Sequence, residues 1–140
     1  MAKLYVMVGL PGSGKSTWAS QKGLPVHSSD SIRKELYGDE AIQGDGEKVF
    51  SILRRRIAHD LRAGQDCICD ATNLTQRTRK QFAQWPGVKT VAVWVNTPLE
   101  ECLRRNANRD RRVPENVIQR MAKNLTPPHI FEGFAHVIEV

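Results

Sequence analysis

The stretch Gly9-Leu10-Pro11-Gly12-Ser13-Gly14-Lys15-Ser16 decides the fold of this 140-residue chain. Its spacing is that of a P-loop, in which glycines let successive backbone N–H groups turn inward around an anion at the start of a helix. The apolar run 4–8 precedes the stretch and predicts a strand, and a helix is predicted from about Lys15. Because a strand, a glycine-rich turn and a helix follow one another, the sequence predicts a site for ATP or GTP. A glycine-rich turn without a ligand is the alternative.

The composition is that of an ordinary globular domain. Hydrophobic residues make up 40% of the chain and charged residues 26%, which excludes a disordered chain or a fibre, and the length predicts one domain over 1–140. Lys and Arg number 21 against 15 Asp and Glu, a net charge of +6 that favours a polyanionic partner. No signal peptide or membrane-spanning run is present, so we expect a cytoplasmic protein that does not contact a membrane.

The three cysteines predict no disulfide framework. Cys67 and Cys69 lie two residues apart on one face of an expected strand, and no second cysteine pair is present to complete a zinc site with them. We interpret them as reduced residues of a cytosolic protein's core.

Short apolar runs alternate with longer amphipathic stretches along the rest of the chain. Further strands are predicted at 24–27, 67–69, 88–95 and 135–140. Helices are predicted at 30–37, from about 49 to 63, at 74–85, after Thr97 as N-cap, and at 116–124, with a polar loop at 39–46. This alternation predicts an α/β fold with a parallel sheet of about five strands, flanked by helices and joined by right-handed crossovers.

Asp30 and Arg33 follow the second predicted strand, at the sheet edge where ligands of open α/β folds bind. Three residues apart at a helix start, they share a face. A carboxylate beside the γ-phosphate can take the proton of an acceptor hydroxyl, and an arginine can hold an anionic group of the acceptor. The alternative is that Ser29 or Asp30 caps the helix and that Arg33 forms a surface ion pair with Asp30.

Asp70 ends the apolar strand 67–69, in the position of an acid that holds the water shell of Mg²⁺ or orients Ser16. The alternative is a cap for the helix that starts near Thr75. Arg105, Arg109 and Arg112 would form one stripe if their helix continued, and Val113-Pro114 suits a hinged lid that brings arginine to the γ-phosphate. For Arg104 the alternative is a solvated face with Glu100–Arg104 and Glu101–Arg105 pairs.

Taken together, these segments resemble the 5′-hydroxyl polynucleotide kinases, both the phage-type enzymes and the kinase module of bacterial RNA end-repair enzymes. The matching residues occur in family order and span nearly the whole chain: 9–18, Ser28-Ser29-Asp30 with Arg33, 70–74 with Arg79, Arg105-Asn106 with Asn108-Arg109, and Val113-Pro114. Ser31 departs from the phage-type pattern, which has a second aspartate there.

The resemblance implies an adenylate-kinase-like fold with an arginine-bearing lid, ATP and Mg²⁺ as cofactors, and the 5′-hydroxyl ends of RNA or DNA as acceptors. The implied catalytic residues are Lys15, Asp30 as base, Arg33 as clamp on the acceptor's 3′-phosphate, Asp70 and Arg109. The expected nucleotide-binding residues are Gly9, Pro11, Gly12, Ser13, Gly14, Lys15, Ser16, Thr17, Arg105 and Arg109, and Mg²⁺ is expected at Ser16 and Asp70.

Three other functions remain open at this point. Related P-loop kinases phosphorylate small hydroxyl compounds such as nucleosides, sugars or nucleotide sugars, and nothing in the loop 39–46 identifies the acceptor. An ATPase without an acceptor has no use for a pair such as Asp30 and Arg33. A silent binding module has no use for an intact Lys15.

Overall fold

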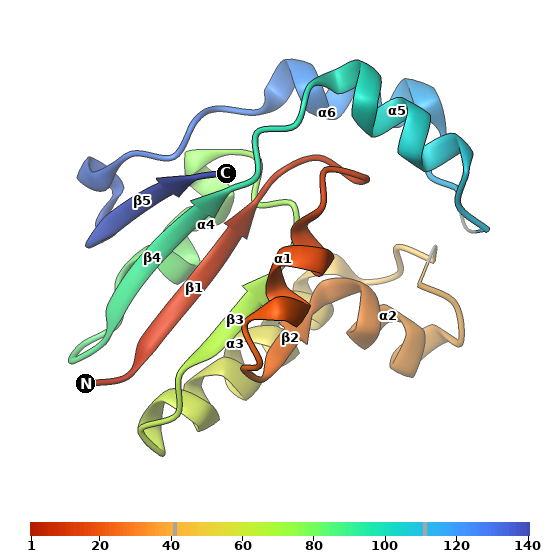
Figure 1. The fold of residues 1–140 in the computed structure, drawn as a ribbon. Coiled ribbons are helices and arrows are strands. Elements are labelled where there is room, and N and C mark those ends of the chain that lie inside the picture. Colours follow the sequence, from red (N-terminus) through yellow and green to blue (C-terminus); the bar gives the residue numbers. More distant parts are fainter. Residues whose placement is uncertain (41, 111) are drawn as a thin grey trace.

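Five parallel strands form one sheet in this computed structural model, which describes residues 1–40, 42–110 and 112–140 (Figure 1). The strands are β1 (Lys3–Val8), β2 (Val26–Ser28), β3 (Cys67–Asp70), β4 (Lys89–Trp94) and β5 (His136–Glu139). They lie in the order β2-β3-β1-β4-β5, and every neighbouring pair is parallel. The predicted α/β fold with a parallel sheet of about five strands is confirmed.

Helices cover both faces of the sheet. They are α1 (Lys15–Gln21), α2 (Ser29–Tyr37), α3 (Gly46–Arg62), α4 (Gln76–Ala83), α5 (Leu99–Ala107), α6 (Glu115–Asn124) and the short 3₁₀ helix η1 (Ile130–Glu132). In Figure 1, α1 lies in front of the sheet, α3 and α4 lie behind it, and α5 and α6 cross above the carboxyl ends of the strands. No helix in the described part of the chain is long and apolar enough to cross a membrane.

The strands bury both faces because their side chains alternate. Leu4 and Val6 of β1 join the core cluster that includes α3, whereas Met7 packs in a second cluster with Ala19 of α1. On α3, Val49, Leu53, Ile57 and Leu61 form an apolar stripe that is buried in the core. Burial of each such side chain contributes about 1.5–3 kcal/mol, so tertiary packing holds α3 in place.

Element boundaries differ from the sequence prediction at several points. Strand β2 begins two residues later than expected, and α4 is shorter than the predicted 74–85 because Asn73 adopts a left-handed conformation (φ 47°) and Thr75 is extended. The Thr75 hydroxyl accepts a hydrogen bond from the N–H of Thr78 at 3.2 Å and caps α4. Helix η1 was not predicted.

The topology brings the ends of four strands together. Strands β1, β2, β3 and β4 are parallel, so their carboxyl ends meet at one edge. The P-loop follows β1, α2 follows β2, Asp70 ends β3, and Thr97 follows β4. Ligands of open α/β sheets bind at this edge.

Candidate active site

The P-loop connects β1 to α1 and has the backbone that its glycines permit. Gly12 and Gly14 have φ of 82° and 106°, a region that L-residues rarely adopt. A Cβ on Gly12 would lie 2.8 Å from the carbonyl oxygen of Cys102, and one on Gly9 would lie 2.7 Å from Ser13 Oγ. These glycines therefore allow the loop to turn and to pack under α5.

Thr97 and Arg105 hold the P-loop from the neighbouring segment. The Thr97 hydroxyl donates to the carbonyl oxygen of Ser13 at 2.7 Å, and Arg105 Nη1 donates to the same oxygen at 3.1 Å. The predicted N-cap role of Thr97 is therefore wrong: Pro98 precedes the first residue of α5, and no side chain caps the helix. The loop backbone is fixed before any ligand arrives.

Lys15 lies among the groups expected to surround the transferred phosphate. Its ammonium donates to the carbonyl oxygen of Leu10 at 3.1 Å. Burial lowers the pKa of Lys15, while the charges of Asp70 and Asp30 act in the opposite direction. Both predicted carboxylates are thus near enough to the lysine to act on its charge.

Ser16 and Asp70 contact each other directly. The Ser16 hydroxyl donates to Asp70 Oδ2 at 2.9 Å, and Asp70 is 9% exposed. Asp70 does not cap α4, since Thr75 does so. Hydroxyl and carboxylate oxygens are the donors that Mg²⁺ prefers, and Ser13 Oγ is buried without a hydrogen-bond partner among the described residues. The residues present therefore suit both Mg²⁺ and a phosphate oxygen.

Asp30 and Arg33 lie in the first turns of α2. Ser28 caps this helix, because its hydroxyl accepts from the N–H of Ser31 at 3.1 Å. The cap at Ser29 or Asp30, which belonged to the alternative interpretation, is therefore wrong. Arg33 Nη1 contacts Asp30 Oδ1 at 3.2 Å, and the two side chains are 13% and 47% exposed. Arg33 Nε is buried and has no partner within 1–40, 42–110 and 112–140. The ion pair of the alternative interpretation is therefore present, but its guanidinium is mostly buried while its carboxylate is half exposed.

The arginine-rich segment does not form one helical stripe. Helix α5 ends at Ala107, and the side chain of Asn106 bridges to the backbone of Val113 with bonds of 2.7 and 2.9 Å. Arg104 pairs with Glu101 rather than with Glu100. Hydrogen bonds from Arg104 and then Arg105 lower the pKa of Glu101 to about 2. Arg111 lies outside the described residues.

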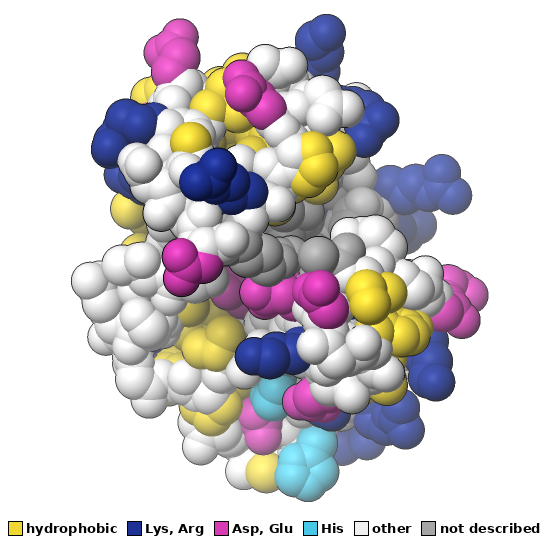
Figure 2. Space-filling model, turned by 90° about the vertical axis from the view of Figure 1, so that its right-hand side faces the viewer, with side chains coloured by type: hydrophobic (Ala, Val, Ile, Leu, Met, Phe, Trp, Pro, Cys, Tyr) yellow, Lys and Arg dark blue, Asp and Glu magenta, His cyan; other side chains and the backbone are white. Residues whose placement is uncertain are grey.

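One cleft of about 1670 Å³ brings the predicted residues together. Its lining includes Lys15, Ser16, Asp30, Arg33, Asp70, Arg105, Arg109 and Arg112, as well as Pro11, Gly12, Ser13, Gly14 and Thr17. Gly9 is buried beside Ser13 and does not line the cleft. On the side of the molecule shown in Figure 2, acidic side chains gather at mid-height and Lys and Arg side chains lie around them, so this side has no uniform basic patch.

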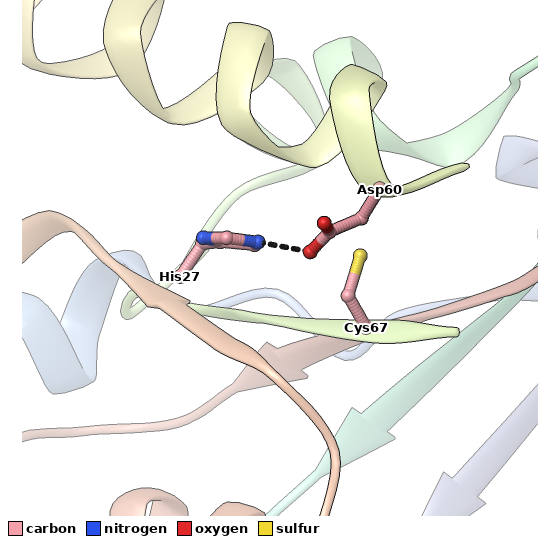
Figure 3. A group of neighbouring side chains, drawn as sticks. All are labelled: His27, Asp60 and Cys67. Carbon is pink, nitrogen blue, oxygen red and sulfur yellow. Dashed lines mark hydrogen bonds and ion pairs between the residues drawn. The ribbon is translucent and has the colours of Figure 1, made fainter. Parts of the chain in front are cut away.

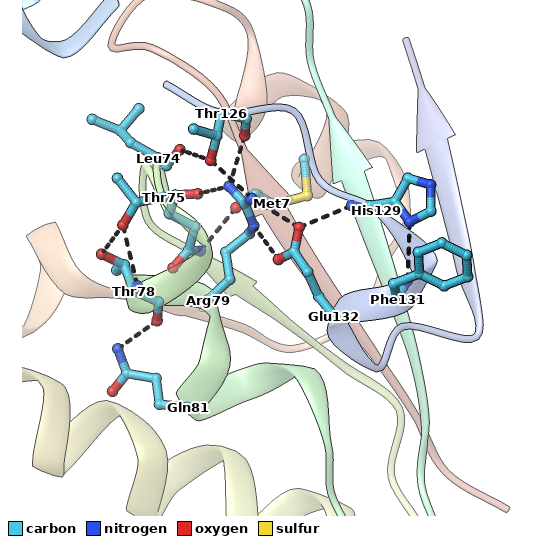
Figure 4. Close-up of polar contacts among 11 residues, drawn as sticks. Met7, Leu74, Thr75, Thr78, Arg79, Gln81, Thr126, His129, Phe131 and Glu132 are labelled. Atoms are coloured by element: carbon cyan, nitrogen blue, oxygen red, sulfur yellow. Dashed lines mark hydrogen bonds and ion pairs between the residues drawn. The ribbon is translucent and has the colours of Figure 1, made fainter. Parts of the chain in front are cut away.

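Asn73 and Arg79 belong to the residues that carry the resemblance, but the sequence did not predict that they position this site. Asn73 Nδ2 donates to the carbonyl oxygen of Met7 at 2.8 Å. Arg79 is fully buried, and its Nη1 donates to the carbonyl oxygen of Asn73 at 2.9 Å. Arg79 also pairs with Glu132 through two bonds of 2.8 and 3.0 Å (Figure 4). Arg79 therefore fixes the turn after Asp70 and does not line the cleft. A buried Arg–Glu pair 53 positions apart leaves no local signal in the sequence.

Comparison with known proteins agrees with this geometry. The model of the AAA domain family matches residues 4–128. Among solved structures, a chain of the Pnkp1/Rnl/Hen1 RNA repair complex is 21% identical with a TM-score of 0.74, covering 89% of this chain and 44% of its own length. A sugar kinase from Janibacter sp. HTCC2649 has the same TM-score at 19% identity, and the match covers 99% of this chain and 86% of the sugar kinase.

Shikimate kinase from Acinetobacter baumannii, solved with shikimate, is 22% identical with a TM-score of 0.57 and covers 100% of this chain and 84% of its own. This chain thus spans less than half of the RNA repair chain, and no curated protein matches it in sequence. The similarity to the solved structures is a similarity of fold. The similar structures include kinases that act on different acceptors. The family match covers most of the chain, and together with the P-loop and the parallel sheet it shows that the chain belongs to the AAA domain family.

Proposed function

We propose that the chain transfers the γ-phosphoryl group of ATP to the 5′-hydroxyl end of RNA or DNA, and that residues 1–140 suffice for this step. The observation that carries the proposal is the Asp30–Arg33 pair in the same cleft as Lys15. A buried guanidinium N–H without a partner, such as Arg33 Nε, costs free energy unless a ligand accepts from it. An anionic group on the acceptor would do so.

The donor half of the site would hold the ATP phosphates. The P-loop backbone and Lys15 offer N–H donors and positive charge, and Ser13 Oγ is available to a phosphate oxygen. Ser16 and Asp70 would hold Mg²⁺, which neutralises charge on the phosphate oxygens. Arg109 lines the cleft from the segment after α5 and would stabilise the charge that grows during transfer, together with Arg105 once that side chain leaves the Ser13 carbonyl.

Asp30 would act on the acceptor. Its carboxylate takes the proton of the 5′-hydroxyl as that oxygen forms a bond to the γ-phosphorus. The bond between this phosphorus and the bridging oxygen of the β-phosphate breaks, and ADP leaves. The Asp30 side chain is half exposed, so the proton passes on to water.

The role of Arg33 can be tested with acceptors that differ by one phosphate. Transfer from γ-labelled ATP would be measured to a 5′-hydroxyl oligonucleotide, to a nucleoside 3′-monophosphate and to the plain nucleoside. A partly buried arginine–phosphate contact contributes about 1.5–3 kcal/mol. We therefore expect the unaltered protein to use the 3′-monophosphate at least tenfold better than the nucleoside.

Arg33→Ala should abolish this preference and raise the oligonucleotide KM about tenfold or more, with the ATP KM nearly unchanged. Arg56→Ala is the matched control, because Arg56 lies on α3, pairs with exposed Glu35 and does not line the cleft. Asp30→Asn should retain ATP binding and lose a factor of about 10²–10⁴ in transfer. Equal use of nucleoside and 3′-monophosphate, unchanged by Arg33→Ala, contradicts the proposal.

A small-molecule hydroxyl kinase is the second candidate. The sugar kinase has the same TM-score as the RNA repair chain, and the match covers 86% of its length. A panel of nucleosides, sugars and sugar acids in the same assay separates the two candidates, since a neutral acceptor needs no anion clamp at Arg33.

A further inference from the structure

Three side chains with metal-binding atoms meet outside the lining of the cleft. His27 comes from β2, Asp60 from α3 and Cys67 from β3. His27 Nε2 lies 2.6 Å from Asp60 Oδ2. The ligand atoms of all three residues lie within 4.8 Å of one another. Figure 3 shows the imidazole and the thiol both directed toward the Asp60 carboxylate. None of the three lines the cleft.

The fold fixes the positions of these side chains. β2 pairs with β3, and His27 lies opposite Cys69 in this register, two residues from Cys67. At the end of α3, the backbone carbonyl of Asp60 accepts hydrogen bonds from the N–H groups of Ala63 at 3.1 Å and Gln65 at 2.9 Å. These backbone contacts end α3 at Arg62, so Asp60 lies in its last turn, and its carboxylate lies near His27 of β2 and Cys67 at the start of β3.

The surroundings allow a cation to enter and favour its charge. The side chains of His27 and Asp60 are 19% and 21% exposed, whereas Cys67 is fully buried. The site is thus open on the imidazole and carboxylate side and closed behind the sulfur. Burial, together with the charges of Asp60 and Asp66, raises the pKa of Cys67 to about 12. A cation that displaces the thiol proton relieves this repulsion.

We propose that His27, Asp60 and Cys67 bind a Zn²⁺ ion, with the fourth position left to water. A nitrogen, an oxygen and a sulfur donor form a set that suits Zn²⁺, whereas Mg²⁺ takes oxygen ligands. Tetrahedral coordination needs donor atoms about 3.3–3.6 Å apart. The His27–Asp60 contact must therefore lengthen from 2.6 Å, and the thiol, which lies within 4.8 Å of the other two groups, must reach the same separation from them. Side-chain rotation supplies shifts of this size.

The sequence prediction found no second cysteine pair for a zinc site, and this site uses only one cysteine. Its ligands come from three elements separated by 33 and 7 positions, a spacing that no short zinc motif has. Zn²⁺ would join β2, α3 and β3 through residues that do not line the cleft. Binding is therefore measured by stability and by spectroscopy, independently of kinase activity.

The test uses the whole chain, freed of metal with a chelator that is then removed. Co²⁺ serves as a spectroscopic probe for Zn²⁺, because a cobalt–thiolate bond gives a charge-transfer absorption. We expect one equivalent of Co²⁺ to produce this band and Zn²⁺ to displace it. Zn²⁺ at a hundredfold excess over its Kd should raise Tm by about 5–10 °C.

Matched variants assign the site. Cys67→Ala should lose the thiolate band, and Cys69→Ala, also buried on β3, should keep it. His27→Gln should weaken Zn²⁺ binding at least tenfold, and His136→Gln on exposed β5 should not. Asp70→Asn should retain binding, which separates this site from the Ser16–Asp70 pair. If Cys67→Ala fails to fold, the Zn²⁺ affinity of His27→Gln decides whether the site exists. Absence of binding, or binding unchanged in His27→Gln, overturns the proposal.

Discussion

Replacing Glu132 with alanine should destabilise the fold more than any comparable change at a surface ion pair. Arg79 is fully buried, and Glu132 is 7% exposed at its side chain. The carboxylate accepts from Arg79 Nε at 2.8 Å, from Arg79 Nη2 at 3.0 Å and from the N–H of His129 at 2.9 Å. Glu132→Ala removes all three bonds and leaves a guanidinium uncompensated in the core. Breaking a buried pair from one side costs about 3–5 kcal/mol.

For a chain of this length, that loss lowers Tm by about 10–15 °C. Urea unfolding, monitored by tryptophan fluorescence and circular dichroism, would measure the change in the free energy of unfolding. We expect the slope m to stay constant. Glu35→Ala is the control, since Glu35 pairs with Arg56 in solvent and such pairs contribute below about 1 kcal/mol. If Glu132→Ala is no more destabilising than Glu35→Ala, the reasoning about the buried pair is refuted.

Three further predictions concern the cleft and the core. Lys15→Ala should lower the rate of transfer by about 10²–10⁴, because charge on the phosphate oxygens is left uncompensated; label transfer that persists in this variant contradicts the phosphate-loop assignment. Arg109→Ala should lower kcat more than it raises the acceptor KM, whereas Arg104→Ala should be far milder because Arg104 contacts Glu101 at the surface; equal losses indicate general electrostatic attraction. In metal-free protein at pH 8, iodoacetamide should modify Cys67 about a thousandfold more slowly than a thiol of pKa 9.0, since its pKa of about 12 leaves little thiolate, and urea should abolish the protection. Fast alkylation of the folded chain contradicts this.

The sequence predicted the features that depend on local patterns. The P-loop turn and the alternation of strands and helices follow from spacing and periodicity, and the structure confirms both. Placing Asp30 and Asp70 near Lys15 followed from parallel strands that end at one edge. Such inferences succeed because the features depend only on residues close in sequence and on the direction of the strands in the sheet.

Features that depend on tertiary partners were mispredicted or missed. Thr97 has the sequence context of an N-cap, but its hydroxyl contacts Ser13, a residue 84 positions away. Ser28 caps α2 because β2 ends one residue before the helix begins, and no propensity separates it from Ser29. The Arg79–Glu132 pair and the His27–Asp60–Cys67 cluster join distant segments for which a single sequence has no signal.

The identity of the acceptor depends on Arg33 more than on the fold. In the proposed function, the donor half would be formed mostly from backbone N–H groups and Lys15, which any P-loop kinase needs. Similarity of fold therefore extends equally to an RNA repair chain and a sugar kinase. The acceptor half would be formed from side chains at the start of α2. There Arg33 is held at 13% exposure by its contact with Asp30, with one N–H unpartnered among the described residues. Burying a cation beside the base costs desolvation free energy. A neutral sugar carries no negative charge that would offset this cost, so a site for neutral sugars gains nothing from such a cation. A terminal nucleotide with a 3′-phosphate offsets that cost, and this is the physical reason to expect a polynucleotide acceptor.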